Sequence, residues 1–597
     1  MLRPSVFTGP VFAKELRVAA HRRRTFWLRF AYVALLGALI VMVWANAVHD
    51  TPDSPAARIY SMAEGGQMIV GTIAVSQFLL VQLLAIVLMS TSISDEIHHR
   101  TLAAVMTTPI NSFQIVFGKL WAKLWQLAIL MGVSVPLLAM VRVFGGVPWD
   151  YIMQAVCLTV CTSVLVGAVS MYFSIFTRRA YAVMLKTIIL LAVVFILLPI
   201  AAIFIVDYWD TSSGNQAMLS AATILCNTSP YMGFYYCTGV MAQPGAAVGG
   251  PFFSLPLVCG VTLGASALLL TVCVMAVRKA ALRQATGEVG LFKPRRKRSK
   301  NAPAPRVARD GAIRTVRGSP IVWRELRQRV LKGGRLSRIV VPILIGVFLA
   351  GLFAHLDAEG YLKDENAQIT FIVIIVLFGL LSTCIFSATG ITTEKESRSW
   401  PVLLTTTLND WQILLGKAAG IWRRCVPIWC VLFACLFLFT LFMPCLHAFV
   451  WVHMGLLVLC VMIFFTGMGL YFGVRLRRTT PAVLVNLAVA IAAWCLLPFF
   501  LVVAAGEGPR GNGLVPIADV ALRANPVMQA VTVTEGAVFE VRYRRANHYY
   551  RWESVWSALN TDTVGATHIM LANLAGYSAL GGVFFWRARR RLRRNID

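Results

Sequence analysis

Twelve long apolar runs divide this chain of 597 residues, and they constrain its fold more than any other feature. A helix needs roughly 20 apolar residues to cross the hydrocarbon core of a bilayer. The runs lie near 26–47, 67–92, 118–143, 148–176, 180–206, 251–277, 336–355, 368–390, 416–443, 446–474, 481–505 and 566–587. We therefore expect an all-α polytopic membrane protein with twelve transmembrane helices.

The composition agrees with a membrane location. Hydrophobic residues make up 58% of the chain and charged residues 14%, whereas a soluble protein is about half apolar and about a quarter charged. Lys and Arg outnumber Asp and Glu by 55 to 26, for a formal net charge of +29. These basic residues gather in short segments between the apolar runs, as in cytoplasmic loops, so the charge does not indicate nucleic-acid binding.

The positions of the arginines predict the orientation of the spans. Clusters at 22–24, 178–179 and 475–478, and the C-terminal "RARRRLRRNID", all fall on one side of a twelve-span topology. The loops 48–66 and 207–250, on the other side, carry at most one basic residue each. By the positive-inside rule we expect both termini in the cytoplasm.

The chain divides into two tandem units of six spans. Between them lies a polar stretch with "KPRRKRSKNAPAPRVARDG", whose like charges, Pro and Ala predict a disordered cytoplasmic connector. We assign the first unit to 1–282, the basic linker to 283–314 and the second unit to 315–597. A nuclear-localisation or heparin-binding function of the basic run is the alternative, but motifs this short often match by chance.

The two units repeat one another at two polar segments. "PVFAKELR" (10–17) matches "PIVWRELR" (320–327), each just ahead of the first span of its half. "ISDEIHHRTLAAVMTTPINSFQIVFGK" (93–119) matches "ITTEKESRSWPVLLTTTLNDWQILLGK" (391–417) without a gap, each between the second and third spans. The shared pairs are Ile93/Ile391, Glu96/Glu394, Arg100/Arg398, Thr107/Thr405, Thr108/Thr406, Asn111/Asn409, Gln114/Gln412, Ile115/Ile413, Gly118/Gly416 and Lys119/Lys417. Because both copies have the same orientation, we expect a pseudo-two-fold axis along the membrane normal.

The first copy of the longer segment contains four residues that could ligate a metal, namely Asp95, Glu96, His98 and His99. The second copy replaces all but the glutamate with Thr393, Glu396 and Ser397. A function common to both halves therefore does not depend on these ligands. We interpret the histidines as cytoplasmic residues near the membrane surface, with a metal site in the first half alone as the alternative.

The Gly-Lys that ends each copy does not belong to a phosphate-binding loop. A Walker A loop requires Gly-x4-Gly-Lys-Ser/Thr. Phe113 and Trp411 stand where its first Gly is required, and Leu120 and Ala418 follow the lysines. We therefore expect no ATP-binding loop and no catalytic residue in this chain.

The residues shared by both copies predict the local structure. Glu96 and Arg100, like Glu394 and Arg398, have the i,i+4 spacing that favours an ion pair at the end of the second span. A short amphipathic helical piece should follow in each copy, and the double threonine should end it.

A second helix should begin a few residues later. Asn111 and Gln114, with their second-copy equivalents, have capping-box spacing, so a new helix is expected to start there and run into the third span. Gly118 would allow close packing, and the side chain of Lys119 could extend to the membrane interface. Because this polar pattern recurs while the apolar sequence has diverged, we interpret it as a surface for a partner that contacts both halves.

These patterns resemble a known family. A "P-x4-E-L-R" segment before six spans, with "E-x3-R-[ST]-x5-T-T-x2-N-x2-Q-I-x2-G-K" after the second, is similar to the permease subunits of type-2 ABC exporters. The resemblance covers nearly the whole chain, twice. It implies an interfacial helix before each first span, a coupling helix after each second span, and a separate ABC ATPase subunit, in two copies, that binds ATP and Mg. It also implies a bacterial inner (plasma) membrane location, and it leaves this chain with no cofactor of its own.

The resemblance assigns roles to individual residues. Those expected to dock the ATPase are Glu96, Arg100, Thr107, Thr108, Asn111, Gln114, Gly118, Lys119, Glu394, Arg398, Thr405, Thr406, Asn409, Gln412, Gly416 and Lys417, and those on interfacial helices are Glu15, Arg17, Glu325 and Arg327. The second copy has Thr407 in place of Pro109 and Trp400-Pro401 in place of Leu102-Ala103. We therefore expect a shorter coupling helix there.

The function implied is export of a substrate, driven by ATP hydrolysis on the partner. The second and fifth spans of each half would line the path, with Ser76, Gln77, Gln82, Ser382, Thr383 and Asn486 as candidate lining residues. An interhelical hydrogen bond is an equally good interpretation of each. The alternatives are a non-transporting scaffold and an ion-coupled secondary transporter. The expected spans have no Asp or Glu in their middle, which argues against ion coupling.

Two cysteines differ from the rest in their expected location. Cys226 and Cys237 share one expected external loop, where a disulfide could form. The other eleven lie in or beside apolar runs, where cysteine behaves as a small hydrophobic residue.

Overall fold

The computed structural model describes most of both halves. The described residues are 9–20, 55–94, 110–142, 147–177, 180–199, 228–242, 254–285, 319–327, 365–442, 449–498, 515–542 and 563–593, with isolated positions between them. The expected spans near 26–47 and 336–355, and most of the linker 283–314, lie outside these residues.

The first half consists of helices that follow its apolar runs. They are α1 (Gly9–Ala20), α3 (Pro55–Met89), α6 (Ser112–Arg142), α7 (Trp149–Phe176), α8 (Ala180–Ala192), the π-helix η1 (Val193–Leu197), α11 (Pro230–Ala242) and α12 (Leu255–Ala285). Apart from α1 and α11, each coincides with an apolar run of the sequence. The π-helix continues α8 directly.

The second half has the same order of long helices. They are α13 (Pro320–Arg327), α15 (Glu365–Glu396), α16 (Trp400–Leu404), α17 (Asp410–Phe442), α18 (Phe449–Arg475), α19 (Thr479–Ile491), the π-helix η3 (Ala492–Leu496), α21 (Val515–Ala524), α22 (Pro526–Arg542) and α23 (Thr563–Arg591). No strand occurs among the described residues of either half. The expected all-α class is therefore confirmed.

Nine of the described helices are long and apolar enough to cross a membrane. They coincide with nine of the twelve expected spans. The expected span at 180–206 is represented by a shorter apolar helix, Ala180–Phe195. The protein is therefore an integral, multi-pass membrane protein.

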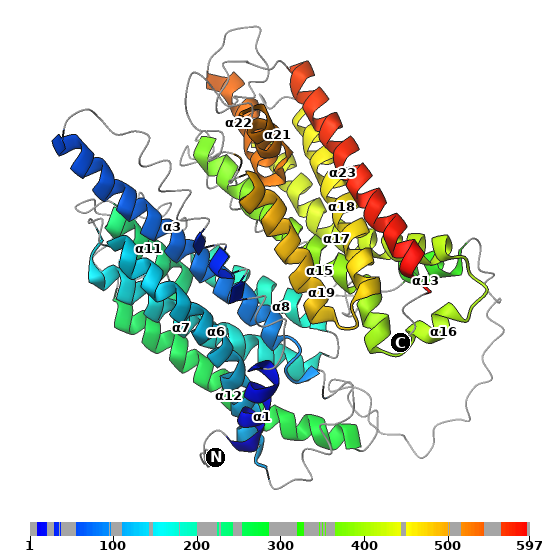
Figure 1. Ribbon diagram of the computed structural model, residues 1–597, viewed down its shortest axis with the longest axis horizontal. Helices are drawn as coiled ribbons and strands as arrows, with labels where there is room; N and C mark the ends of the chain where they lie inside the picture. Colours follow the sequence, from blue (N-terminus) through cyan, green and yellow to red (C-terminus); the bar gives the residue numbers. More distant parts are fainter. Residues whose placement is uncertain are drawn as a thin grey trace.

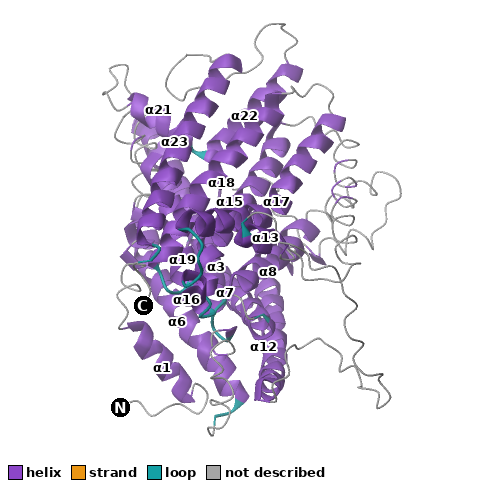
Figure 2. Ribbon diagram, turned by 90° about the vertical axis from the view of Figure 1, so that its right-hand side faces the viewer, coloured by secondary structure: helices purple, strands orange, loops and turns teal. Residues whose placement is uncertain are grey.

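The helices form two bundles that follow the two halves of the chain (Figure 1). In the first bundle α7 packs against α3 and α12, and in the second α18 packs against α15 and α23. The long helices run along a common direction (Figure 2), and each bundle encloses an apolar core. Helices α1, α13 and α16 lie toward one end, which corresponds to the expected cytoplasmic side.

The bundles touch through the second and fifth spans of each half. Helices α3 and α8 of the first bundle contact α15 and α19 of the second. Tyr181 on α8 packs its ring 6.0 Å, centroid to centroid, from Phe386 on α15. The guanidinium of Arg424 on α17 lies 5.9 Å from the centroid of the same tyrosine ring.

Two segments expected to be external loops contain helices. Helix α11 lies within 207–250, and α21 and α22 lie within 506–565. Cys237 is a buried free thiol on α11 and not a loop residue, and Cys226 lies outside the described residues. The structure therefore does not contain the disulfide considered for these two cysteines.

Close backbone contact holds α18 against α23 in the second bundle. A Cβ atom at Gly467 would lie 2.2 Å from the backbone oxygen of Gly581, and one at Gly581 would lie 2.9 Å from the backbone oxygen of Ile463. Small residues at such contacts let helix backbones approach closely in membranes.

We expect Gly467→Ala to destabilise the purified protein by about 1–3 kcal/mol, because the two backbones must separate to admit the methyl group. Gly582→Ala is the matched control, since a Cβ atom there meets nothing within 4 Å. Thermal unfolding in detergent measures both. Equal melting temperatures for the two variants would contradict this packing.

Candidate functional site

The candidate site lies where the two repeated segments meet at the expected cytoplasmic end of the second bundle. It is formed by the short helix α13, the end of α15, helix α16 and the start of α17 (Figure 1). Helix α13 fits against α17 because α17 presents glycine there: a Cβ atom at Gly416 would lie 2.5 Å from a methyl carbon of Ile321. Gly420 similarly faces Glu325.

Five charged side chains form a cluster that joins these helices. We call Arg324, Glu325, Glu394, Lys417 and Arg424 the charge cluster. The Lys417 ammonium lies 2.7 Å from a carboxylate oxygen of Glu325, and the Arg424 guanidinium lies 2.9 Å from the other oxygen. Lys417 and Arg324 both also bind Glu394. The side chains of Glu325 and Lys417 are only 2% and 3% exposed, so this pair is shielded from water.

The electrostatics of the cluster favour its charged form. Burial by itself would raise the pKa of Glu325, but the nearby Lys417 and Arg424 overcome this effect and lower the pKa below its ordinary value of 4.5. Burial would likewise lower the pKa of Arg324, yet the carboxylates of Glu394 and Glu325 raise it. Both groups are therefore charged at neutral pH.

The first bundle contains the equivalent of the central pair. The Lys119 ammonium lies 2.7 Å from a carboxylate oxygen of Glu96, and it also donates to the backbone oxygen of Ser92. The interfacial helix of this half is joined to α6 by a longer ion pair, since the Lys123 ammonium lies 3.7 Å from a carboxylate oxygen of Glu15. Gln126 stands where the second half has Arg424, so the first half lacks this cation.

Two expectations about these residues are wrong. The carboxylate of Glu394 binds Lys417 and Arg324 and not Arg398. Lys119 and Lys417 are buried and do not extend to the interface. The physical reason is that a buried carboxylate on the adjacent helix offers these lysines a stronger partner than water does. Arg100 lies outside the described residues.

Arg398 instead ends helix α15. Its φ of 55° lies in the left-handed region. The backbone N–H of Ser399 donates to the oxygen of Glu394, and that of Arg398 donates to the oxygen of Lys395. This is the hydrogen-bond pattern of a Schellman cap, in which glycine usually occupies the left-handed position. Arg398 therefore occupies a backbone conformation that glycine would adopt with less strain. Strained residues of this kind are typical of functional segments.

The hydrogen bond from the N-cap backbone to the N3 side chain of each predicted capping box is present. The backbone N–H of Asn111 donates to the Gln114 side chain at 3.3 Å, and that of Asn409 donates to Gln412 at 3.2 Å. Helices α6 and α17 start at the next residue in each copy. The double threonine ends α16 in the second copy as expected, with Thr405 as its C-cap. Its first-copy equivalents, Thr107 and Thr108, lie outside the described residues.

The segment between α15 and α17 presents an exposed surface. Buried Trp400 and Leu403 anchor α16, whereas Val402 on its opposite side is 68% exposed. The other exposed side chains of this surface are Arg398, Pro401, Thr405, Thr406, Thr407, Asn409 and Gln412. We call it the exposed coupling surface. Arg17 and Arg327 are exposed on their interfacial helices.

The end of α15 also holds the turn between the fourth and fifth spans. The Lys395 ammonium donates to the backbone oxygens of Val474 and Leu476, at the end of α18. A carboxylate oxygen of Glu396 accepts from the backbone N–H of Thr479 at 2.6 Å, at the start of α19. A carboxylate is stabilising at a helix N-terminus. Sequence reasoning did not find these two residues, because the first copy has Ile97 and His98 in their place.

The candidate lining residues are buried at the second and fifth spans, except Ser76, which is half-buried and bonds to its own helix. Gln82 donates to the backbone oxygen of Thr159, Thr383 accepts from the indole N–H of Trp429, and Asn486 donates to Ser387. The side-chain oxygens of Gln77, Gln82 and Asn486 are buried with no hydrogen-bond partner among the described residues. Ser382 is also buried.

Both fifth spans contain a π-helix that is bonded to the helix after it. The Ser229 hydroxyl donates to the backbone oxygen of Phe195 in η1 at 2.6 Å. The Asn525 amide donates to the backbone oxygen of Trp494 in η3 at 2.7 Å. These two polar residues also cap α11 and α22, since each accepts from a backbone N–H of its helix. π-helical turns within α-helices frequently mark functional positions.

This correspondence has a sequence signal that was missed. Ser229-Pro230 and Asn525-Pro526 are each followed by a methionine at the same spacing, Met232 and Met528. An N-cap residue followed by Pro at the first helical position is a helix-start signal. The external regions should therefore have been expected to contain helices.

The bundles of long apolar helices define a polytopic membrane protein. Residues 10–243 match the family described as ABC-2 family transporter protein. The matched residues are confined to the first half of the chain, and they support an ABC-2 type permease, the membrane component of an ABC transporter. No curated protein matches the chain.

We expect Lys417→Met to destabilise the protein by about 1.5–3 kcal/mol, because the buried carboxylate of Glu325 loses a charge-assisted hydrogen bond and keeps only its arginine partners. Lys123→Met is the matched control. Its partner Glu15 is 3.7 Å away and the pair is partly exposed, so the loss should stay below about 1 kcal/mol. Thermal unfolding of both variants measures the two losses of stability. An equal loss of stability in both would show that the charge cluster does not stabilise the contact between these helices.

Proposed function

We propose that this chain is the transmembrane permease component of a bacterial ABC exporter, with two fused six-span units and a dimeric ATPase on its cytoplasmic side. The supporting observation is the buried Glu–Lys pair that recurs in both halves, because it fixes each repeated segment to the third span. A segment fixed in this way can move a whole span when a partner displaces it. Both termini would lie in the cytoplasm of an inner (plasma) membrane.

The ATPase would dock on the exposed coupling surface and its first-half equivalent. The exposure of Val402 supports this proposal, since an apolar side chain on a cytoplasmic segment gains from being covered. The left-handed Arg398 supports it as well. Glu394 and Lys417 are among the residues that the family resemblance assigns to docking. Because their charges bind one another, they would hold the exposed coupling surface in position and not contact the ATPase directly.

Two sets of contacts could carry motion from this surface to the fifth spans. Lys395 and Glu396 bind the turn that starts α19. Arg424 binds Glu325 and also lies over the ring of Tyr181 at the start of α8. Closure of the ATPase dimer on ATP would thus reach both fifth spans, and the bundles would rock about their contact.

The substrate path would run between the two bundles. The buried and unpartnered amide oxygens of Gln77, Gln82 and Asn486 support this placement, because they lie on the spans that bring the halves together and would gain hydrogen bonds from a substrate or water. Their interhelical bonds would hold the closed state. An ion-coupled transporter or a scaffold without transport are the alternatives that the experiment must separate.

The test is the purification of the full chain from its native membrane with its ATPase, followed by reconstitution into vesicles. We expect Val402→Glu to weaken ATPase binding at least tenfold, because it adds a charge at the centre of the docking surface. Val520→Glu, on exposed α21 at the other end of the bundle, is the matched control and should bind normally.

Three results would contradict the proposal. The first is equal ATPase binding by both variants. The second is substrate flux that a proton gradient drives without ATP. The third is a complex that hydrolyses ATP yet moves nothing, which would favour the scaffold.

A further inference from the structure

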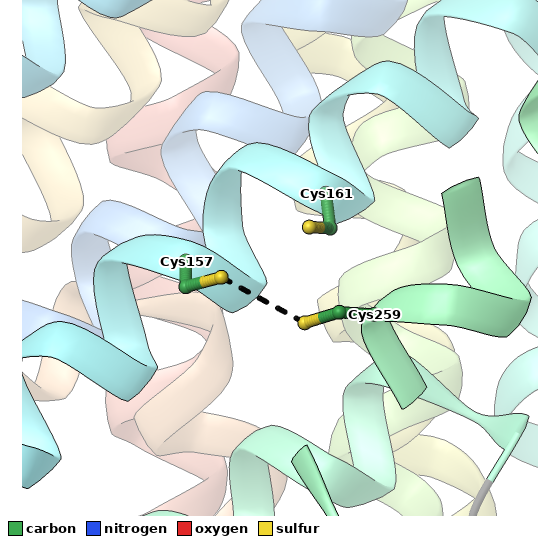
Figure 3. Close-up of side chains that lie close together, drawn as sticks. All are labelled: Cys157, Cys161 and Cys259. Atoms are coloured by element: carbon green, nitrogen blue, oxygen red, sulfur yellow. Dashed lines mark hydrogen bonds between the residues drawn. The ribbon is translucent and has the colours of Figure 1, made fainter. Parts of the chain in front are cut away.

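Three cysteines converge toward the expected external end of the first bundle. Cys157 and Cys161 are four residues apart on α7 and therefore share one face of that helix. Cys259 lies on the neighbouring α12 and points toward them (Figure 3). The sulfurs of Cys157 and Cys259 are 3.8 Å apart, and all three sulfurs lie within 4.8 Å of one another.

These distances fit a metal ion with three sulfur ligands. Metal–thiolate bonds of about 2.3 Å place the sulfurs of a planar trigonal site about 4.0 Å apart. Two ligands from one helix face and a third from the facing helix could therefore reach one ion with only small side-chain movements. Cysteines that serve only as small apolar residues need no such convergence.

We propose that Cys157, Cys161 and Cys259 form a binding site for copper(I). Soft thiolate ligands select copper(I) and zinc among biological metals. Structural zinc sites are almost always four-coordinate. The group of His, Cys, Asp and Glu side chains found here has three members among the described residues, all of them sulfur ligands. A three-sulfur site thus favours the monovalent, soft ion.

The site lies near the expected external end of both helices. Cys157 lies eight residues after the start of α7 and Cys259 four residues after the start of α12, which corresponds to depths of about 12 Å and about 6 Å along the helices. Both helices begin at this end. Cys157 is exposed on the surface of the bundle, and Cys161 is buried between the helices.

Binding requires no oxidant or reductant. Each cysteine that ligates the ion loses its thiol proton to the external solvent and forms one copper–sulfur bond, so three ligands release three protons. The copper stays in the monovalent state throughout. The affinity should therefore fall as the pH is lowered. The site lies at the end of the bundle opposite the coupling surface, and its failure would leave the proposed exporter function untouched.

The test titrates the full chain in detergent with copper(I), under reducing, oxygen-free conditions, against a chelator of known affinity. We expect one tightly held ion, and an X-ray absorption spectrum with three sulfur ligands. Cys157→Ser, Cys161→Ser and Cys259→Ser should each weaken binding at least tenfold. Cys273→Ser, a buried cysteine on the same α12, and Cys430→Ser, an exposed one in the second half, should bind as tightly as the unaltered chain.

Each other outcome overturns the proposal. Tight binding that survives Cys259→Ser would place the copper elsewhere. Zinc held more tightly than copper(I) at the same residues would assign the site to zinc. Purification without reductant tests for a disulfide. If two of the three cysteines then resist alkylation, and the reduced protein binds no copper, the cysteines form a redox-active disulfide instead. Equal and weak binding by all variants would leave three packing cysteines.

Discussion

The expected cytoplasmic end of each bundle depends on an ion pair between the end of the second span and a buried lysine at the start of the third. Taking a lysine and a glutamate out of water costs several kcal/mol for each ion, so such a pair persists only where geometry and further hydrogen bonds compensate. Lys417 meets this condition with two carboxylates, and Lys119 meets it with one carboxylate and a backbone oxygen. The pair fixes the angle at which the repeated segment leaves one span and enters the next.

The two halves use this tie with different strength. In the second half Glu325 adds the interfacial helix α13 to the cluster, and Arg424 extends it toward the first bundle. In the first half the ion pair of the interfacial helix is the longer contact between Glu15 and Lys123. A partner dimer that binds both repeated segments would therefore displace the third spans of the two halves unequally. The segment of the second half would be the more rigidly coupled of the two.

The sequence predicted the helices well because apolar length is a local property. The capping boxes at Asn111 and Asn409 were also predictable, since their partners lie three residues away. The partners of Glu394 were not, because a local i,i+4 rule favoured Arg398 whereas the structure supplied Lys417 from the next helix and Arg324 from 70 residues earlier. Lys395 and Glu396 were missed for the same reason, since their roles depend on where the following helices return.

The most direct test of this mechanism follows motion from the ATPase to the fifth spans. Spin labels introduced as noncanonical residues at Leu198 and Leu497, two exposed positions directly after η1 and η3, report the distance between the bundles and leave the native cysteines intact. In the assembled complex, trapping the ATP-bound state should shift this distance in the unaltered chain. In a folded Lys417→Met complex that still binds and hydrolyses ATP, the shift should be absent. A full shift in that variant would contradict the proposal that the buried ion pair couples the motor to the membrane path.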